Sequence, residues 1–192
     1  MDPTVNAWRK AQRTRLLGQR QSLSPDDRLR AAEVIGGQLS AIVAANGIAS
    51  VGLYWPIKQE ISLLAWANEL AGERNVVLCL PVVVTPKEPL EYWRWSQGEP
   101  LARGIWNIPV PAERDVVLPD LMLAPVVGFD RANYRLGYGG GYFDRTLASL
   151  RRRPMVVGIG YAFSALETIF PQTHDIPMDA VLTDTPMPLE QP

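Results

Sequence analysis

Residues 49–80, with the sequence ASVGLYWPIKQEISLLAWANELAGERNVVLCL, decide the fold class. The apolar runs at 49–54 and 76–80 are short, and a proline closely follows each, which is typical of buried strands. Between them, residues 61–70 repeat apolar side chains at helical spacing. A strand, a helix and a strand within about 30 residues predict a parallel crossover unit.

The same alternation continues on both sides of this unit. A basic helix is predicted at the N-terminus, and a second helix begins at the capping sequence Ser24-Pro25-Asp26-Asp27 and stops near Asn46-Gly47. Later elements are predicted as strands at 90–95 (at an edge or in a hairpin), 121–124 and 155–159, with a helix at 142–150. Together they predict one α/β domain with a mostly parallel sheet, and the tail at 184–192 is expected to fray.

Composition sets the class of protein. The chain has 192 residues, of which 47% are hydrophobic and 20% charged, with a formal net charge of -1. The length fits one domain or at most two small ones, and the composition excludes disordered and collagen-like proteins. A net charge near zero argues against general nucleic-acid binding, which usually needs a basic field.

A single cysteine and a single histidine exclude several kinds of site. Cys79 has no partner for an intramolecular disulfide, and with His174 it cannot build a zinc site of the usual type. A serine–histidine triad would depend on His174 alone, and both residues are interpreted as structural. We find no apolar segment typical of a secretory signal or a membrane helix, and we expect a cytoplasmic protein.

The stretch RLGYGGGYFD at 135–144 carries the clearest chemical signal. Four glycines within five positions expose successive backbone amides, which can form a nest for an anion at the start of a helix. Arg135 could hold the same anion with two hydrogen bonds. The spacing matches neither a P-loop nor a dinucleotide fingerprint, and a plain glycine-rich turn is the alternative.

Charged residues elsewhere fit a phosphate site. Asp144, just after the nest, could hold a magnesium ion that bridges phosphate oxygens, with Asp179 as a second carboxylate. Each acid alone could equally be a surface or capping residue. Arg9 and Arg13 share one face of the first helix, for which the alternative is a solvated basic surface.

Aromatic residues in polar loops suggest a flat ligand. Trp106 lies in the proline-bounded segment Trp106-Asn107-Ile108-Pro109, where a tryptophan can stack on a ring. A tryptophan that covers the core is an equal alternative. Trp55 and Glu60 are scattered in sequence, and spacing alone assigns them no role.

These motifs, taken together, resemble a known family. Gly128-Phe129-Asp130 followed by 135–144 resembles the signature of 5-formyltetrahydrofolate cyclo-ligase, also called methenyltetrahydrofolate synthetase. Further segments match the family pattern in order: the basic N-terminal helix, Tyr54-Trp55-Pro56 with Glu60-Ile61, Trp106 to Pro111, and His174 to Asp179. The resemblance covers nearly the whole chain.

The resemblance implies a single three-layer α/β/α domain over residues 1–192, with a Rossmann-like sheet of the NagB/RpiA/CoA transferase-like kind. It also implies an ATP-dependent ring closure of 5-formyltetrahydrofolate to 5,10-methenyltetrahydrofolate, with release of ADP and phosphate. The formyl oxygen would attack the γ-phosphate, and the 10-nitrogen would then close the ring as phosphate leaves. Such chemistry needs positioned cations and amides more than a covalent nucleophile.

The resemblance also assigns roles to residues. ATP would be bound by Arg9, Lys10, Arg13, Arg135, Leu136, Gly137, Tyr138, Gly139, Gly140, Gly141, Tyr142 and Phe143. The folate would face Trp55, Glu60, Trp106 and Tyr142. Arg135 and Tyr142 are the catalytic candidates, and Asp144 with Asp179 would hold magnesium.

Three positions depart from the family pattern. Arg9 stands where the family usually has a lysine, Pro125-Val126 where it has Pro-Gly, and Phe143 where it has tyrosine. A non-catalytic folate- or nucleotide-binding paralogue is therefore one alternative, and an ATP-using enzyme of the same fold with another acyl-amide substrate is another. The expected partners are small molecules only, without nucleic acid or membrane, and the expected state is a monomer.

Overall fold

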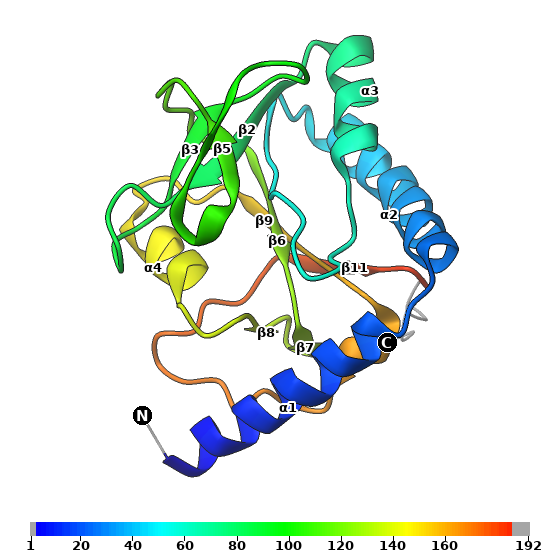
Figure 1. Cartoon of the computed structure of the whole chain (residues 1–192), viewed down its shortest axis with the longest axis vertical. Helices are drawn as coiled ribbons and strands as arrows, with labels where there is room; N and C mark the ends of the chain where they lie inside the picture. The colour runs from blue at the N-terminus through cyan, green and yellow to red at the C-terminus, as the bar shows by residue number, and fades with distance from the viewer. Residues whose placement is uncertain (1–2, 186–192) are drawn as a thin grey trace.

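The structure, a computed structural model, describes residues 3–185 and is built around a twisted six-stranded sheet (Figure 1). Its strands lie in the order β11 (Ala180–Thr183), β9 (Met155–Gly160), β6 (Leu121–Pro125), β1 (Ser50–Gly52), β2 (Val77–Val82) and β3 (Glu91–Arg94). All neighbouring pairs are parallel except β2 with β3, which is antiparallel at the edge. The predicted mostly parallel α/β sheet is confirmed.

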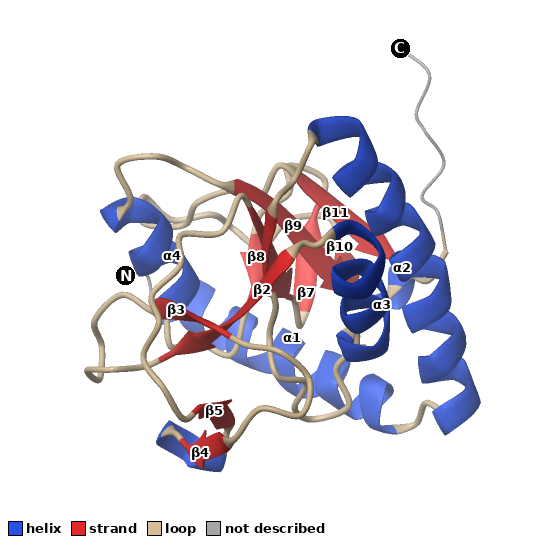
Figure 2. Ribbon diagram, turned by 90° about the horizontal axis from the view of Figure 1, so that it is seen from above, coloured by secondary structure: helices blue, strands red, loops and turns tan. Residues whose placement is uncertain are grey.

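Helices cover both faces of this sheet. Figure 2 shows α2 (Pro25–Asn46) and α3 (Leu64–Arg74) on one side and α4 (Tyr142–Ser149) on the other. Side chains of β6 alternate between the two cores: Leu121 and Leu123 pack in the core that contains Leu39 of α2, and Met122 packs in the core that contains Leu147 of α4. This alternation is the two-residue period of a strand that is buried on both faces.

The start and end of α2 follow from local chemistry. The Ser24 hydroxyl accepts from the Asp27 backbone N–H, and the Asp27 carboxylate accepts from the Ser24 backbone N–H, which forms a capping box. Gly47 ends the helix with φ 59°, a left-handed conformation that glycine adopts at little cost. The predicted bounds of this helix are confirmed.

Two smaller sheets complete the fold. One contains β10 (Ala165–Leu166), β7 (Gly128–Asp130) and β8 (Arg135–Leu136); the other pairs β4 (Leu101–Arg103) with β5 (Pro109–Pro111) around a 3-10 turn at Ile105–Asn107. Helix α1 (Pro3–Gln21) lies against β7, where a Cβ on Gly128 would come within 2.8 Å of Leu16 Cδ1. Only glycine allows this close approach of the helix to the strand.

The structure differs from the sequence prediction at short elements. The helix expected from 61 begins at Leu64, and β2 continues past the expected stop at Pro81, which lies opposite Tyr92 of the edge strand β3. Six strands of two to four residues have no periodic signal of their own and are not predicted from the sequence: β4, β5, β7, β8, β10 and β11. Of the tail expected to fray, residues 186–192 lie outside the described range, and Asp184 accepts a hydrogen bond from the Ala162 N–H at 2.7 Å.

Within residues 3–185, no helix is long and apolar enough to span a bilayer.

Candidate active site

A cavity of about 760 Å³ opens at the carboxyl ends of the parallel strands. Its wall includes Tyr54 and Trp55, which follow β1, Leu80 of β2, and Pro125 at the end of β6. This edge is where α/β sheets bind their ligands, because the loops that follow adjacent strands meet there. The cavity is large enough for a drug-sized ligand and is the candidate active site.

The glycine-rich loop forms one wall of the cavity, between β8 and α4. Gly139 and Gly141 have φ 98° and 66°, and Gly141 is the residue before α4. Arg13 of α1 reaches this loop and donates from Nε to the Gly137 carbonyl at 2.7 Å. Partial burial and the nearby charge of Arg9 lower the pKa of Arg13. The structure therefore brings together the predicted nest and one predicted cation.

Gly140 is needed for space and not for a positive φ. A Cβ at this position would lie 2.9 Å from Cδ2 of Tyr142, whose ring also lines the cavity. If the loop binds phosphate, as the resemblance implies, we expect Gly140→Val to displace that ring and to weaken ATP binding at least tenfold while the fold survives, because the added side chain would block the close approach of the backbone. Calorimetric titration of ATP measures the affinity, and a folded variant with wild-type affinity would remove the loop from the nucleotide site.

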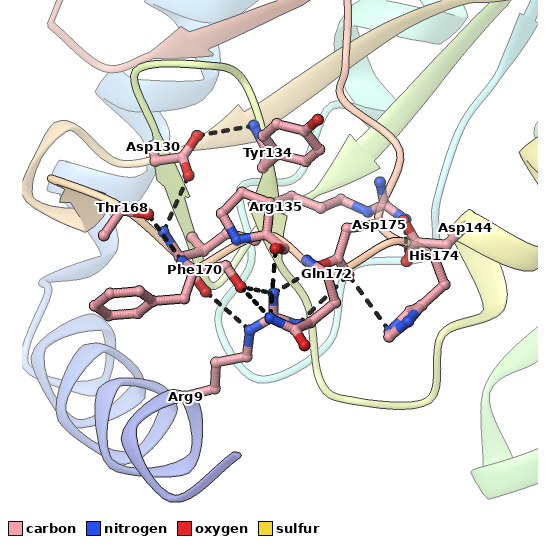
Figure 3. Close-up of polar contacts among 12 residues, drawn as sticks. Arg9, Asp130, Tyr134, Arg135, Asp144, Thr168, Phe170, Gln172, His174 and Asp175 are labelled. Atoms are coloured by element: carbon pink, nitrogen blue, oxygen red, sulfur yellow. Dashed lines mark hydrogen bonds and ion pairs between the residues drawn. The ribbon is translucent and has the colours of Figure 1, made fainter. Parts of the chain in front are cut away.

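Arg9 connects α1 to the segment that follows β10 (Figure 3). Its guanidinium donates to the Ile169 carbonyl at 2.9 Å and the Phe170 carbonyl at 3.0 Å, and pairs with the Asp175 carboxylate at 2.5 Å. Burial opposes the ionisation of Asp175, but the Arg9 guanidinium and the Gln172 N–H favour it, and the net effect lowers the pKa of Asp175. Arg9 lines the cavity, yet its three nitrogens already have protein partners.

Arg135 and Asp144 form a second ion pair beside the first. Arg135 Nη2 lies 2.9 Å from Asp144 Oδ2, and the other oxygen of Asp144 accepts from the Ile176 N–H at 3.0 Å. The Asp144 and Asp175 carboxylates both act on Arg135, where they oppose the lowering of its pKa by burial. Figure 3 shows Arg135 beside these two acids. The cavity thus contains alternating positive and negative groups drawn from distant parts of the chain.

Asp179, predicted as a magnesium ligand together with Asp144, lies apart from Asp144 and its ion pair. Its carboxylate accepts from the Val156 N–H at 2.7 Å and pairs with Arg153 at 3.2 Å, and it does not line the cavity. Asp175, four positions earlier, lines the cavity with Asp144. Both acids belong to the segment at 174–179, and its sequence alone does not indicate which of them lines the cavity.

Three aromatic residues assigned to the folate line the same cavity, and two of them, Trp106 and Tyr142, are in contact. Trp106 is 66% exposed and packs edge-on against Tyr142, with ring centroids 5.5 Å apart. Trp55 also lines the cavity and packs edge-on against Trp95. Trp106 has φ 58° within the 3-10 turn, a left-handed conformation that is uncommon for residues other than glycine.

Glu60 is a buried carboxylate at the cavity wall. It is 7% exposed, and its two oxygens accept from the Tyr138 hydroxyl and the Ile57 N–H, both at 2.9 Å. Burial raises the pKa of Glu60, while these two hydrogen bonds and the charge of Arg20 oppose the rise. A polar group held this way at the wall of an apolar cavity can orient a ligand.

Three other residues are placed differently from the sequence expectation. Lys10 is exposed and outside the cavity lining, and Leu136 is buried in β8 and also outside it. His174, interpreted from the sequence as structural, lines the cavity with a half-exposed side chain. Cys79 is buried, and burial raises the pKa of its thiol to about 12, so it stays protonated.

Among the described residues, no group of three or more His, Cys, Asp or Glu is placed to hold a metal by itself. Asp144 and Asp175 are two carboxylates that line one cavity, and each retains acceptor capacity beyond the bonds described above. Magnesium is commonly held by one or two carboxylates together with water and substrate phosphates. The residues present fit a magnesium ion that arrives with a nucleotide.

The family model described as the 5-formyltetrahydrofolate cyclo-ligase family matches residues 5–184. The chain belongs to this family. The match includes the glycine-rich loop, the ion pairs and the aromatic wall. It confirms the family that the sequence motifs predict, and with it the prediction of an enzyme.

Several known members of the family are similar to this chain over most of their length. The chain is 30% identical over 180 residues to a 5-formyltetrahydrofolate cyclo-ligase of Mycolicibacterium smegmatis, covering 89% of this chain and 91% of the relative. A solved 5,10-methenyltetrahydrofolate synthetase of Aquifex aeolicus matches with a TM-score of 0.79 and 31% identity, covering 93% of this chain and 90% of that one. The synthetase of Mycoplasma pneumoniae gives a TM-score of 0.77 at 26% identity, covering 92% and 99%.

Proposed function

We propose that the chain is an ATP-dependent cyclo-ligase that converts 5-formyltetrahydrofolate into 5,10-methenyltetrahydrofolate, ADP and phosphate. The observation that carries the proposal is one cavity lined by the glycine loop, two ion pairs and an aromatic wall in a chain that belongs to the family. Phosphoryl transfer needs cations and amides in fixed positions, which the loop and the arginines supply. Aromatic rings and a carboxylate suit the flat, nitrogen-rich ring of a folate.

The residues divide into two groups by chemistry. The amides of 137–141 with Arg13 and Arg135 receive the triphosphate, since Arg13 bonds the loop at the Gly137 carbonyl and both arginines line the same cavity as the loop. Trp55, Trp106 and Tyr142 cover the folate ring, and Glu60 accepts hydrogen bonds from its N–H groups. Arg135 then stabilises negative charge on the transferred phosphoryl group when the formyl oxygen attacks it.

Asp144, with Asp175 in place of Asp179, would hold magnesium on the phosphates. When bound, the ion supplies positive charge to the phosphate oxygens. Both carboxylates also keep the arginines in position, because Asp144 pairs with Arg135 and Asp175 pairs with Arg9.

The absorbance of the methenyl product, followed with and without ATP, tests the proposal. Growth that requires both ATP and 5-formyltetrahydrofolate supports the cyclo-ligase. Absence of product with tight binding of either ligand supports a non-catalytic paralogue, and ATP consumption with a different acyl-amide supports a related ligase. The predicted cytoplasmic location and monomeric state belong to this proposal, and light scattering after size-exclusion chromatography tests the monomer.

Arg13 gives a test of the nucleotide half of the site. We expect Arg13→Ala to weaken ATP binding by about 1.5–3 kcal/mol, the usual contribution of a hydrogen bond to a charged group. Arg15→Ala is the matched control, because Arg15 lies on the same helix but bonds Gln12 and Gln19 on the exposed surface. Titration calorimetry compares the two variants, and equal losses would mean that α1 contributes only a diffuse positive field.

A further inference from the structure

A polar chain behind Glu60 begins at the far end of α1. Arg20 is 3% exposed, and its Nη2 donates to the Val126 carbonyl at 2.5 Å. Its Nη1 donates to the Tyr138 hydroxyl at 3.2 Å, and that hydroxyl donates in turn to Glu60 Oε1 at 2.9 Å. The three side chains come from the helix, the glycine loop and the segment after β1, so the chain exists only in the folded protein.

This chain has a defined direction. A guanidinium has no acceptor, so Arg20 must donate to the Tyr138 oxygen, which directs the hydroxyl proton toward Glu60. Hydrogen bonds arranged head to tail polarise one another and strengthen the bond at the end of the chain. Tyr138 therefore transmits the positive charge of Arg20 to a carboxylate that Arg20 is not itself shown to contact.

Other charged and titratable groups lie near Glu60. The positive charges of Arg20 and Lys58 favour the ionised carboxylate, and the Lys58 ammonium also lies 4.9 Å from the centre of the Tyr138 ring. The hydroxyls of Tyr54 and Tyr161 lie nearby but donate to the Ile61 and Gln59 carbonyls. Among these neighbours, the Tyr138 hydroxyl is the side-chain group that bonds Glu60 directly.

The bonding of Glu60 leaves room for a ligand. An ionised carboxylate has about four acceptor positions, and the Tyr138 hydroxyl and the Ile57 N–H occupy one on each oxygen. One position therefore remains on each oxygen, which suits two adjacent N–H donors on a flat ring. The orientation of this pair depends on the two internal bonds that hold the carboxylate.

We propose that Arg20 and Tyr138 are positioning residues that act through Glu60, fixing its carboxylate so that its free acceptor positions meet N–H donors of the substrate ring. The proposal rests on the proposed function, in which Glu60 faces the folate. It assigns to Tyr138 a role in the folate half of the site, beyond its place in the glycine loop. Arg20 acts on the substrate indirectly, because it reaches Glu60 only through the Tyr138 hydroxyl.

Tyr138→Phe removes one hydroxyl and leaves the ring and its contact with Lys58. We expect KM for 5-formyltetrahydrofolate to rise about tenfold and kcat to stay within about twofold, because substrate and transition state lose the same orienting group. Tyr134→Phe is the control, since Tyr134 does not line the cavity. A purely structural role would lower the melting temperature and the active fraction without this split between KM and kcat.

A measurement without substrate separates this proposal from the proposed function. In protein labelled with ¹³C at glutamate side chains, Glu60→Gln identifies the Glu60 carboxyl signal, whose titration is followed by NMR. The Tyr138 hydrogen bond favours the ionised form, so Tyr138→Phe should move the midpoint to higher pH. A wild-type enzyme that forms no methenyl product would defeat the proposed function but would leave this titration intact.

Arg20 supplies the second arm of the test. Arg20→Met should move the Glu60 midpoint to higher pH, and Arg20→Lys, which keeps the charge, should restore part of the wild-type value. If Arg20→Met does not fold, Tyr138→Phe and Arg20→Lys still decide the outcome. An unchanged Glu60 midpoint together with an unchanged KM in Tyr138→Phe would overturn the proposal.

Discussion

Replacement of Arg135 by methionine is expected to lower kcat for methenyl formation by about 10²–10³-fold, the usual loss when one group that stabilises transition-state charge is removed. Arg135 is 8% exposed and lines the cavity next to the glycine loop. Methionine preserves much of the apolar stem but removes the charge. The same change leaves the Asp144 carboxylate without its ion pair. ATP binding should also weaken, because this uncompensated negative charge would repel the triphosphate.

The control for this variant is Arg153→Met. Arg153 pairs with Asp179 outside the cavity and is about half exposed, so its loss should leave kcat unchanged. Arg135→Lys should recover only part of the activity, because an ammonium cannot reproduce the planar fork of a guanidinium. Stopped-flow or steady-state absorbance gives kcat, and thermal melting shows whether the fold survives. A folded Arg135→Met enzyme with wild-type kcat would exclude Arg135 from the phosphoryl-transfer step.

Asp144→Asn is expected to slow the reaction by about 10²-fold at ordinary magnesium concentrations, because it removes the negative charge that is proposed to hold the metal and that pairs with Arg135. The sequence alone suggests that asparagine would be tolerated as a residue near the start of a helix. The structure changes that expectation, because both carboxylate oxygens of Asp144 accept from donors, the Arg135 guanidinium and the Ile176 N–H. In either orientation, the NH2 group of asparagine would meet one of these donors. We therefore expect a lower melting temperature as well.

The initial rate as a function of magnesium concentration separates the two roles of Asp144. If the loss is one of metal affinity, higher magnesium should recover part of the rate, whereas a loss of Arg135 positioning should not respond to magnesium. Asp179→Asn is the matched control, because it removes the same charge from an acid outside the cavity. Wild-type rates and an unshifted magnesium curve in Asp144→Asn would remove this residue from the metal site.

Local signals in the sequence determined the main elements of the fold. The capping box and Gly47 set the limits of α2, since both depend on contacts within a few residues of the chain. The apolar runs that became β2, β6 and β9 are continuous because each strand is buried on both faces. The glycine-rich loop was likewise evident, because glycine is the residue that permits its backbone conformation.

Only the tertiary structure decided which charged residues share the site. Arg9 was expected to bind phosphate, and it bonds Asp175 and two carbonyls more than 150 positions away. The motif at 174–179 contains two acids. In the structure, Asp175 lines the cavity, whereas Asp179 forms an ion pair with Arg153. Arg20 is linked to Glu60 through the Tyr138 hydroxyl, and the three residues come from separate segments of the chain. A side chain's partner across the fold leaves no periodic or local pattern, because it depends on how helices and strands pack and not on its sequence neighbours.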